Sequence, residues 1–312
     1  MTIGTLTNAS PGGPFATLLH WRPVPLHTPG AAADATRMDT VELLVGDLDG
    51  QTAFYRDAVT LDVLEQSGGR VTLGRDGIPI VTLTHTPDLP PVDRYAAGLY
   101  HTAIAFPDRA ALAAAVLSMA QRAAHLYQGA TDHTFSNAFY FSDPEGNGIE
   151  LYWDRPVEVW QNQPAGWVPT NTAIDPNTFL RAHLEPARVT RDAATVGHVH
   201  LQVGDIAAAR RFYVDTLGFD VVMDLGSALF ISAGGYHHHI GLNTWHSAGA
   251  GPRAVSLGLG DVRVRMPERG DILSLADRAR HHGITAEDDG RAVRLRDPWG
   301  TLLTVAPEAA DA

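Results

Sequence analysis

One short pattern occurs twice in this chain and constrains its fold more than any other feature. In the first copy, a strand-like apolar stretch ends at Asp47 and is followed by a predicted helix, Leu48 to Ala58. In the second copy, 158 residues later, a similar stretch ends at Asp205 and a predicted helix runs from Ile206 to Leu217. An aspartate in this place is a favourable N-cap for the helix that follows. The repeat indicates an internally duplicated structure.

Each half of the chain also contains a second, weaker copy of the same unit. In the first half this copy begins around residue 101 and ends in a hairpin, and in the second half it begins around residue 261 and ends in a similar hairpin. Four units therefore share the order strand, helix and three strands, and they begin near residues 38, 98, 196 and 254. We predict an α+β fold made of four βαβββ units.

The unit positions divide the chain into four segments. Residues 38–153 hold units one and two, and residues 192–308 hold units three and four. Between them, residues 154–191 are rich in Pro, Asn and Trp and are predicted to be a long connector. Residues 1–37 lack periodicity, and we expect them to form an N-terminal arm that lies on the surface or on a partner subunit of a homo-oligomer.

Charge and composition exclude several classes of function. The net charge of −12 argues against a nucleic-acid partner or an anionic membrane, because no basic surface is concentrated enough to follow phosphates. The chain has no cysteine, so any metal must be held by histidines and carboxylates. No export signal and no membrane span are recognisable, and we therefore expect a cytoplasmic protein.

The hairpin predicted over residues 131–152 concentrates groups that carry chemistry. Its first strand alternates Phe139 and Phe141 with Tyr140, which is the period of a half-buried strand. After an Asp-Pro-Glu-Gly turn, the second strand places Glu150 on the face opposite Ile149. One such glutamate is equally consistent with an exposed polar face, so the rest of the chain must decide its role.

These features resemble the vicinal-oxygen-chelate superfamily, which includes glyoxalase I, bleomycin-resistance proteins and extradiol ring-cleaving dioxygenases. The resemblance covers residues 38 to 308 and is closest to bacterial catechol 2,3-dioxygenases. Within the hairpin, the Thr-x-His at His133, the Phe-Tyr at Tyr140, the Asp-Pro-x-Gly turn and Glu150 are similar to the complete extradiol signature. The resemblance implies that pairs of units close into half-barrels around a metal.

The resemblance also implies which strand positions carry metal ligands. At the first-strand position the four units have Thr40, His101, His198 and Asp261, and at the last-strand position units two and four have Glu150 and Thr304. Two histidines and one carboxylate, His101, His198 and Glu150, form the facial triad that suits non-haem Fe(II). We infer that units two and three assemble the site, whereas extradiol enzymes take all three ligands from the C-terminal half.

Three further residues are assigned roles by the same resemblance. His239 matches the acid–base histidine of the extradiol pocket, and strand alternation would place it with Asn243, opposite His238. A fourth-ligand or structural role for His239 remains open. His133 and Tyr140 match residues that donate hydrogen bonds to the bound substrates, although Tyr140 would also suit a plain strand aromatic.

The expected function is extradiol cleavage of a small aromatic diol by O2 at Fe(II), with Mn(II) as the alternative metal. Two other functions stay open from the sequence. A glyoxalase-like isomerase would hold Ni²⁺, Zn²⁺ or Mn²⁺ through four protein ligands. A binder of the bleomycin-resistance kind would need no metal, although unpaired buried imidazoles and carboxylates would then be costly.

Overall fold

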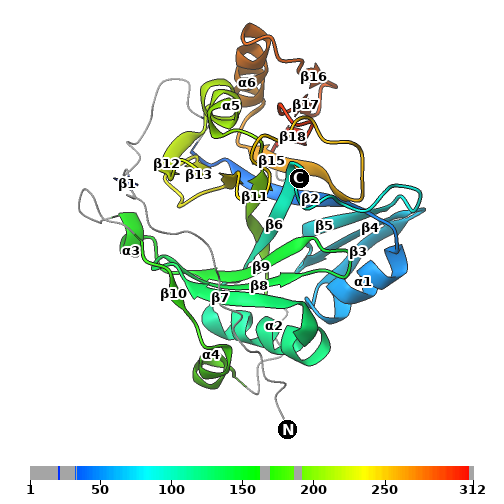
Figure 1. Ribbon diagram of the computed structural model, residues 1–312, viewed down its shortest axis with the longest axis vertical. Helices are drawn as coiled ribbons and strands as arrows, with labels where there is room; N and C mark the ends of the chain where they lie inside the picture. Colours follow the sequence, from blue (N-terminus) through cyan, green and yellow to red (C-terminus); the bar gives the residue numbers. More distant parts are fainter. Residues whose placement is uncertain (1–19, 22–31, 33, 162–168, 186–191, 309–312) are drawn as a thin grey trace.

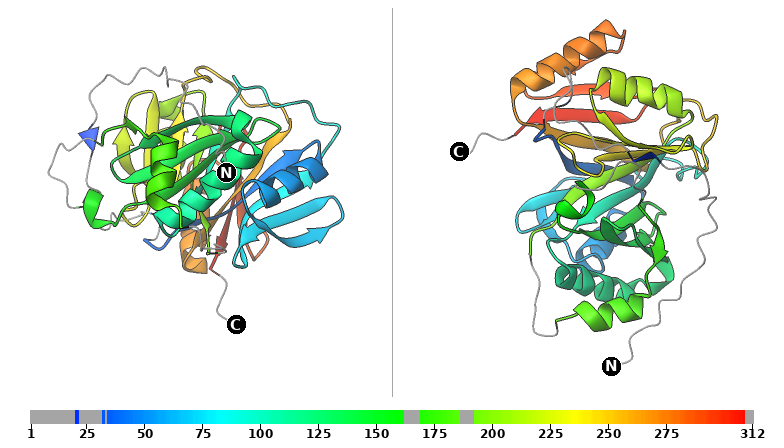
Figure 2. Two further views of the ribbon diagram at one scale, coloured as in Figure 1. Left: turned by 90° about the horizontal axis from the view of Figure 1, so that it is seen from below. Right: turned by 90° about the vertical axis from the view of Figure 1, so that its left-hand side faces the viewer.

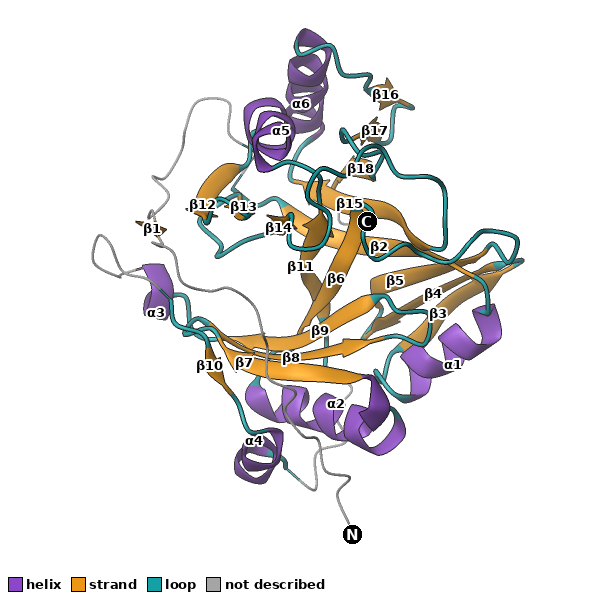
Figure 3. Cartoon of the chain, viewed as in Figure 1, coloured by secondary structure: helices purple, strands orange, loops and turns teal. Residues whose placement is uncertain are grey.

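The computed structural model describes residues 20–21, 32, 34–161, 169–185 and 192–308. Two large sheets form the centre of the protein, and the helices lie around them (Figure 1; Figure 3). Most of the predicted N-terminal arm lies outside the described residues. No helix in the described ranges is both long and apolar enough to cross a membrane.

The first sheet, sheet A, contains ten strands. In spatial order they are β1 (His20–Trp21), β12 (Asp220–Asp224), β13 (Ala228–Ser232), β14 (Ile240–Asn243), β11 (Thr195–Gln202), β6 (Gly98–Ala105), β9 (Gly148–Asp154), β8 (Ser136–Ser142), β7 (Tyr127–Asp132) and β10 (Thr172–Ala173). Apart from the two short edge strands, these are the strands of unit three followed by those of unit two.

The second sheet, sheet B, contains eight strands and is built from units four and one. In spatial order they are β16 (Glu287–Asp288), β17 (Val293–Arg296), β18 (Leu302–Pro307), β15 (Gly258–Met266), β2 (Arg37–Val45), β5 (Ile78–His85), β4 (Arg70–Arg75) and β3 (Asp62–Ser67). The predicted α+β fold of four βαβββ units is confirmed, and the strand order pairs units two and three as inferred from the ligand positions.

The helices cover the outer faces of both sheets. They are α1 (Leu48–Asp57), α2 (Arg109–Arg122), η1 (Ala124–Leu126), α3 (Glu158–Gln161), α4 (Pro176–His183), α5 (Ile206–Arg210), the wider π turn η2 (Arg211–Thr216) and α6 (Arg269–His281). Figure 2 shows α5 and α6 at one end of the molecule and α2 and α4 at the other, with the sheets between them. Residues 154–191, predicted as a connector, contain α3, β10 and α4 among their described residues.

The N-caps form as the sequence predicts. Asp47 accepts a hydrogen bond from the backbone N–H of Gly50, and Asp205 accepts one from that of Ala208. These bonds satisfy backbone donors that the first turn of a helix leaves free. The repeated Gly-Asp pair therefore marks the start of α1 and of α5.

A single apolar core joins the two sheets. The central strands β11 and β6 of sheet A contact β2 and β15 of sheet B. Val199 and Leu201 of β11 belong to the same buried cluster as Val41 and Leu43 of β2. Alternation then turns every second side chain of β11 to the opposite face of sheet A, which we call the inner face. Two histidines of β11, His198 and His200, lie on this inner face.

Candidate metal centre

Three ligands converge where units two and three meet. The Nε2 atoms of His101 and His198 lie 2.9 and 3.0 Å from the same carboxylate oxygen, Oε2 of Glu150. All three side chains are buried, with 6%, 2% and 3% of the surface of His101, His198 and Glu150 exposed. They form the one group among the described residues whose ligand atoms lie close enough together to hold a metal ion.

Strand register places these ligands. In the antiparallel pairing of β11 with β6, His198 lies opposite Ala103 and His200 opposite His101. In the parallel pairing of β6 with β9, Ala103 lies beside Glu150. The three ligand strands are thus consecutive in sheet A, and their alternating side chains meet on the inner face as predicted.

The ligand atoms lie close enough together for one ion to bind all three. The two histidine-to-carboxylate contacts are hydrogen bonds in the structure, and a bound metal would replace them. Burial raises the pKa of Glu150, but contact with His198 and His101 outweighs burial and holds this pKa well below its ordinary value. Glu150 is therefore an anion at neutral pH, as a metal ligand must be.

The position for a fourth protein ligand holds a glycine. In unit two, Glu150 lies beside Ala103, two residues after His101. In unit three the same register places Gly241 beside His200, two residues after His198. A Cβ on Gly241 would lie only 2.9 Å from the imidazole of His200. Unit three therefore offers one candidate ligand to the centre, and the candidate set among the described residues consists of two histidines and one carboxylate.

The two residues of the hairpin signature lie beside the centre. Nε2 of His133 is 2.7 Å from the hydroxyl of Tyr140, and its Nδ1 is 2.6 Å from Oδ1 of Asn171. Burial, followed by the charge of Glu150, raises the pKa of Tyr140 well above its ordinary value. Tyr140 thus keeps its proton at neutral pH and, since Nδ1 of His133 donates to Asn171, its O–H donates to Nε2 of His133 beside the ligand triad.

The histidine triplet does not follow the predicted alternation. Strand β14 begins only at Ile240, and His237–His239 form a bend after Gly234 and Gly235, which both have positive φ. Because of this bend, His238 faces His198, with their ring centroids 4.1 Å apart. The alternation that placed His239 with Asn243, and His238 on the opposite face, was therefore wrong about which of the two faces the ligands.

The imidazole of His239 lies away from the ligands. Its Nδ1 accepts a hydrogen bond from the backbone N–H of Ala233 at 3.2 Å, and its ring lies beside Tyr236. Burial and the neighbouring His237 lower the pKa of His239 to about 3. The register of unit three also gives the fourth-ligand position to Gly241 and not to His239.

His238 is the end of a buried hydrogen-bonded chain that the sequence analysis missed. Its Nδ1 lies 2.8 Å from Nδ1 of His237, whose Nε2 lies 2.8 Å from Oδ1 of Asp154. The carboxylate accepts from Nε2 of His237, which leaves Nδ1 of a neutral His237 to accept the proton on Nδ1 of His238. The remaining nitrogen of His238, Nε2, then carries a free lone pair.

An aromatic wall completes the inner face around the ligands. His200 lies between Tyr100, His101, Phe230 and Trp245, with ring centroids 5.1 to 5.6 Å from its own. Its Nε2 is buried and has no hydrogen-bond partner among the described residues. Tyr152 contacts the ring of His198. Phe139 instead contacts Phe179 on the outer face.

The comparisons with known proteins identify the class. The sequence model of the Glyoxalase/Bleomycin resistance protein/Dioxygenase superfamily matches residues 37–151 and 195–305. The chain therefore belongs to this superfamily, which is the vicinal-oxygen-chelate group that the sequence resembled. Both matched ranges fall on pairs of βαβββ units.

One curated relative matches over most of its length. The catechol-2,3-dioxygenase of Bacillus subtilis (strain 168) is 37% identical over 272 residues, which cover 84% of this chain and 94% of that protein. Among solved structures, a protein of Bacillus subtilis subsp. subtilis str. 168 aligns with 88% of this chain and 86% of its own, with a TM-score of 0.59 and 18% identity. Glyoxalase I from Zea mays aligns with 88% of this chain and 92% of its own, with a TM-score of 0.54 and 16% identity. At these identities the two structures show the shared fold alone.

Proposed function

We propose that this protein is an extradiol dioxygenase, which opens the ring of a catechol beside its two hydroxyl groups. In this proposal His101, His198 and Glu150 hold Fe(II), with Mn(II) as the alternative metal. The observation that carries it is the three-ligand set with Gly241 at the fourth position, because non-haem iron oxygenases need open positions beside a two-histidine, one-carboxylate face. The name of the Bacillus subtilis relative supports the same reaction.

The metal, when bound, supplies a Lewis acid and a common site for the diol and O2. The chain supplies the proton chemistry. His238 takes the acid–base role that the sequence predicted for His239, because its free Nε2 lone pair lies on the inner face beside His198. Asp154 and His237 act as positioning residues that fix the tautomer of His238.

Tyr140 and His133 would act on the oxygens of the substrates as a pair. Nδ1 of His133 donates to Oδ1 of Asn171, so its Nε2 accepts the proton of the Tyr140 hydroxyl at 2.7 Å. The hydroxyl keeps its proton, and rotation of this O–H would exchange its bond to His133 for one to a substrate oxygen. The wall around His200, formed by Tyr100, Phe230 and Trp245, offers aromatic faces to a planar ring. Hydrogen-bond donors on one side and aromatic faces on the other suit a diol on an aromatic ring.

The glyoxalase-like isomerase is the less favoured function. It requires a fourth protein ligand, and Gly241 has no side chain to provide one. The register of β14 also excludes His239 from that position, because His239 precedes Gly241 by two residues and its ring contacts Tyr236.

The decisive experiment is anaerobic loading with Fe(II), followed by addition of catechol and air in an oxygen electrode with absorbance recording. We expect oxygen uptake that matches formation of a yellow ring-opened product. Metal-loaded protein that consumes no oxygen with catechol or with alkyl-substituted catechols would contradict the proposal. A parallel assay for isomerisation of a hemithioacetal would then test the glyoxalase-like function.

A further inference from the structure

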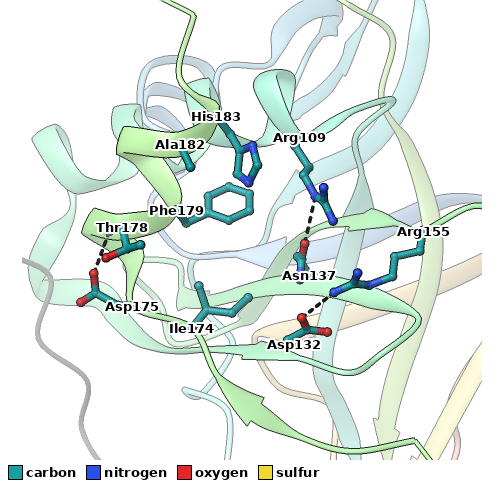
Figure 4. A pocket seen from close by; sticks show the side chains of 10 residues that line it. All are labelled: Arg109, Asp132, Asn137, Arg155, Ile174, Asp175, Thr178, Phe179, Ala182 and His183. Carbon is teal, nitrogen blue, oxygen red and sulfur yellow. Dashed lines mark hydrogen bonds and ion pairs between the residues drawn. The ribbon is translucent and has the colours of Figure 1, made fainter.

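A groove of 360 Å³ lies on the outer face of sheet A, between that face and helix α4 (Figure 4). Strand β8 separates it from the metal centre, because Asn137 points into the groove whereas Tyr140 points to the inner face. The volume falls within the range of pockets that bind small molecules. Nothing in the proposed reaction uses this groove.

The two walls of the groove differ in chemistry. One wall carries the guanidinium groups of Arg109 and Arg155, which project toward Asn137 and Asp132 (Figure 4). The opposite wall is formed by Ile174 and by Phe179, whose ring lies 4.7 Å from that of His183. A ligand between the walls would meet cations on one side and apolar atoms on the other.

Arg109 makes no ion pair within 4 Å among the described residues, although the charge of Asp132 acts on it. Its guanidinium lies over the ring of Trp153 at 4.2 Å, and its Nε donates to Oδ1 of Asn137 at 3.3 Å. These contacts fix the guanidinium plane but do not neutralise its charge. Its two terminal nitrogens keep donors in the fork geometry that matches a carboxylate.

Arg155 leaves a second donor unused. Its Nη2 donates to Oδ2 of Asp132 at 2.5 Å, while its Nε is buried and has no hydrogen-bond partner in the described part of the chain. One carboxylate, Asp132, thus faces two guanidinium groups. The other carboxylate of the groove, Asp175, accepts from the backbone N–H of Thr178 and lies at the far end from Arg109 (Figure 4).

We propose that this groove binds a small carboxylate whose body is aromatic or apolar. The carboxylate would bind the terminal nitrogens of Arg109, beside the guanidinium of Arg155, and the body would contact Phe179 and Ile174. The groove lining has two guanidinium groups and two carboxylates. Asp132 pairs with Arg155 and Asp175 caps the backbone N–H of Thr178, so Arg109 is the charged group that lacks a close ionic partner among the described residues. A bound anion would supply that partner.

A calorimetric titration of the metal-free protein with benzoate tests this proposal. We expect saturable binding at one site, and no saturation with benzamide, which lacks the charge. Arg109→Gln should weaken benzoate binding about tenfold or more, because it removes charge-assisted hydrogen bonds. Arg122→Gln, at the exposed end of the same helix, is the matched control and should bind as the unaltered protein does.

Three further variants separate this site from other causes. Arg109→Lys keeps the charge without the fork and should bind with intermediate affinity, which provides the test if Arg109→Gln does not fold. Phe179→Ala should weaken benzoate more than acetate. Glu150→Ala should leave benzoate binding intact, since the metal centre lies on the other face. Benzoate binding that is absent from the unaltered protein, or unchanged in Arg109→Gln and Arg109→Lys, would overturn the proposal.

Discussion

At the scale of single residues, one glycine limits how many side chains the candidate metal centre can offer. Gly241 occupies the position that Glu150 occupies in unit two, and the ring of His200 fills the space where its side chain would begin. A carboxylate at Gly241 would therefore displace His200 as well as add a ligand. The three-ligand set is thus built into the packing of β11 against β14.

Glu150→Ala should abolish iron binding. The substitution removes the one anionic ligand and leaves His101 and His198 without the carboxylate between them. Iron content after anaerobic loading and desalting measures the effect. Asp261→Asn, at the position in sheet B that corresponds to His101, should bind iron normally. Full iron occupancy in Glu150→Ala would mean that the ion is held elsewhere.

His238→Ala and His239→Ala should differ in turnover. His238 faces the ligands with a free nitrogen, so its loss should lower kcat by about a hundredfold or more while iron content stays unchanged. His239 contacts Ala233 and Tyr236, so its loss should mainly lower stability. The reverse ranking of the two kcat values would restore the role that the sequence predicted for His239.

Asp154→Asn should disturb the same function through tautomer control. Without the carboxylate, Nε2 of His237 loses its charged acceptor, and the proton on Nδ1 of His238 is no longer fixed. We expect kcat to fall about tenfold to a hundredfold and the pH profile of kcat to shift, with iron content retained. Asp154→Glu keeps a carboxylate and should recover part of kcat. An unchanged pH profile of kcat in Asp154→Asn would indicate that the carboxylate has only a structural role.

At the scale of elements, the two halves of the chain share a hydrogen bond from a helical tyrosine to the aspartate of a distant hairpin turn. The hydroxyl of Tyr55 in α1 donates to Asp143 at 3.3 Å, and that of Tyr213 in η2 donates to Asp297 at 3.0 Å. Both aspartates are buried in hairpin turns. These bonds join unit one to unit two and unit three to unit four, although the paired units lie in different sheets.

Tyr55→Phe and Tyr213→Phe should each lower the free energy of unfolding by about 1–2 kcal/mol, because each removes a donor from a buried carboxylate. Tyr213→Phe should have the larger effect, since its bond is shorter. Urea unfolding measures both, with the exposed Tyr95→Phe as the control. Equal stability of all three variants would show that the tyrosine hydroxyls do not join the units.

The elements also show why some features were predictable from the sequence. Alternation holds in β9 and, between the register shifts of their pairing, in β6 and β11, so it placed His101, Glu150 and His198 on one face. Alternation failed at His237–His239, where Gly234 and Gly235 end the regular strand and a bend replaces it. Asp154 was missed because its partner His237 is distant in sequence, and only the pairing of units two and three brings them together.

At the scale of the whole molecule, the inner face of sheet A makes folding sensitive to acid. Burial lowers the pKa of four histidines in this part of the molecule: His133, His198, His200 and His238. For His239 the pKa falls to about 3 from an ordinary value of 6.5. An unfolded chain would protonate these imidazoles much more readily.

The free energy of unfolding of the metal-free protein should therefore fall as the pH drops from about 6.5 toward 3. Above this window His239 is neutral in both states and adds no pH dependence. Within this window, His239 binds a proton in the unfolded state but not in the folded state. The free energy of unfolding therefore rises with pH, by up to about 4 kcal/mol from this residue. His239→Gln keeps an acceptor for the N–H of Ala233 but does not titrate, and should flatten the dependence. Urea unfolding across this pH range measures the slope, with the exposed His85→Gln as the control. An unchanged slope in His239→Gln would mean that His239 takes up its proton without unfolding the bend that buries it.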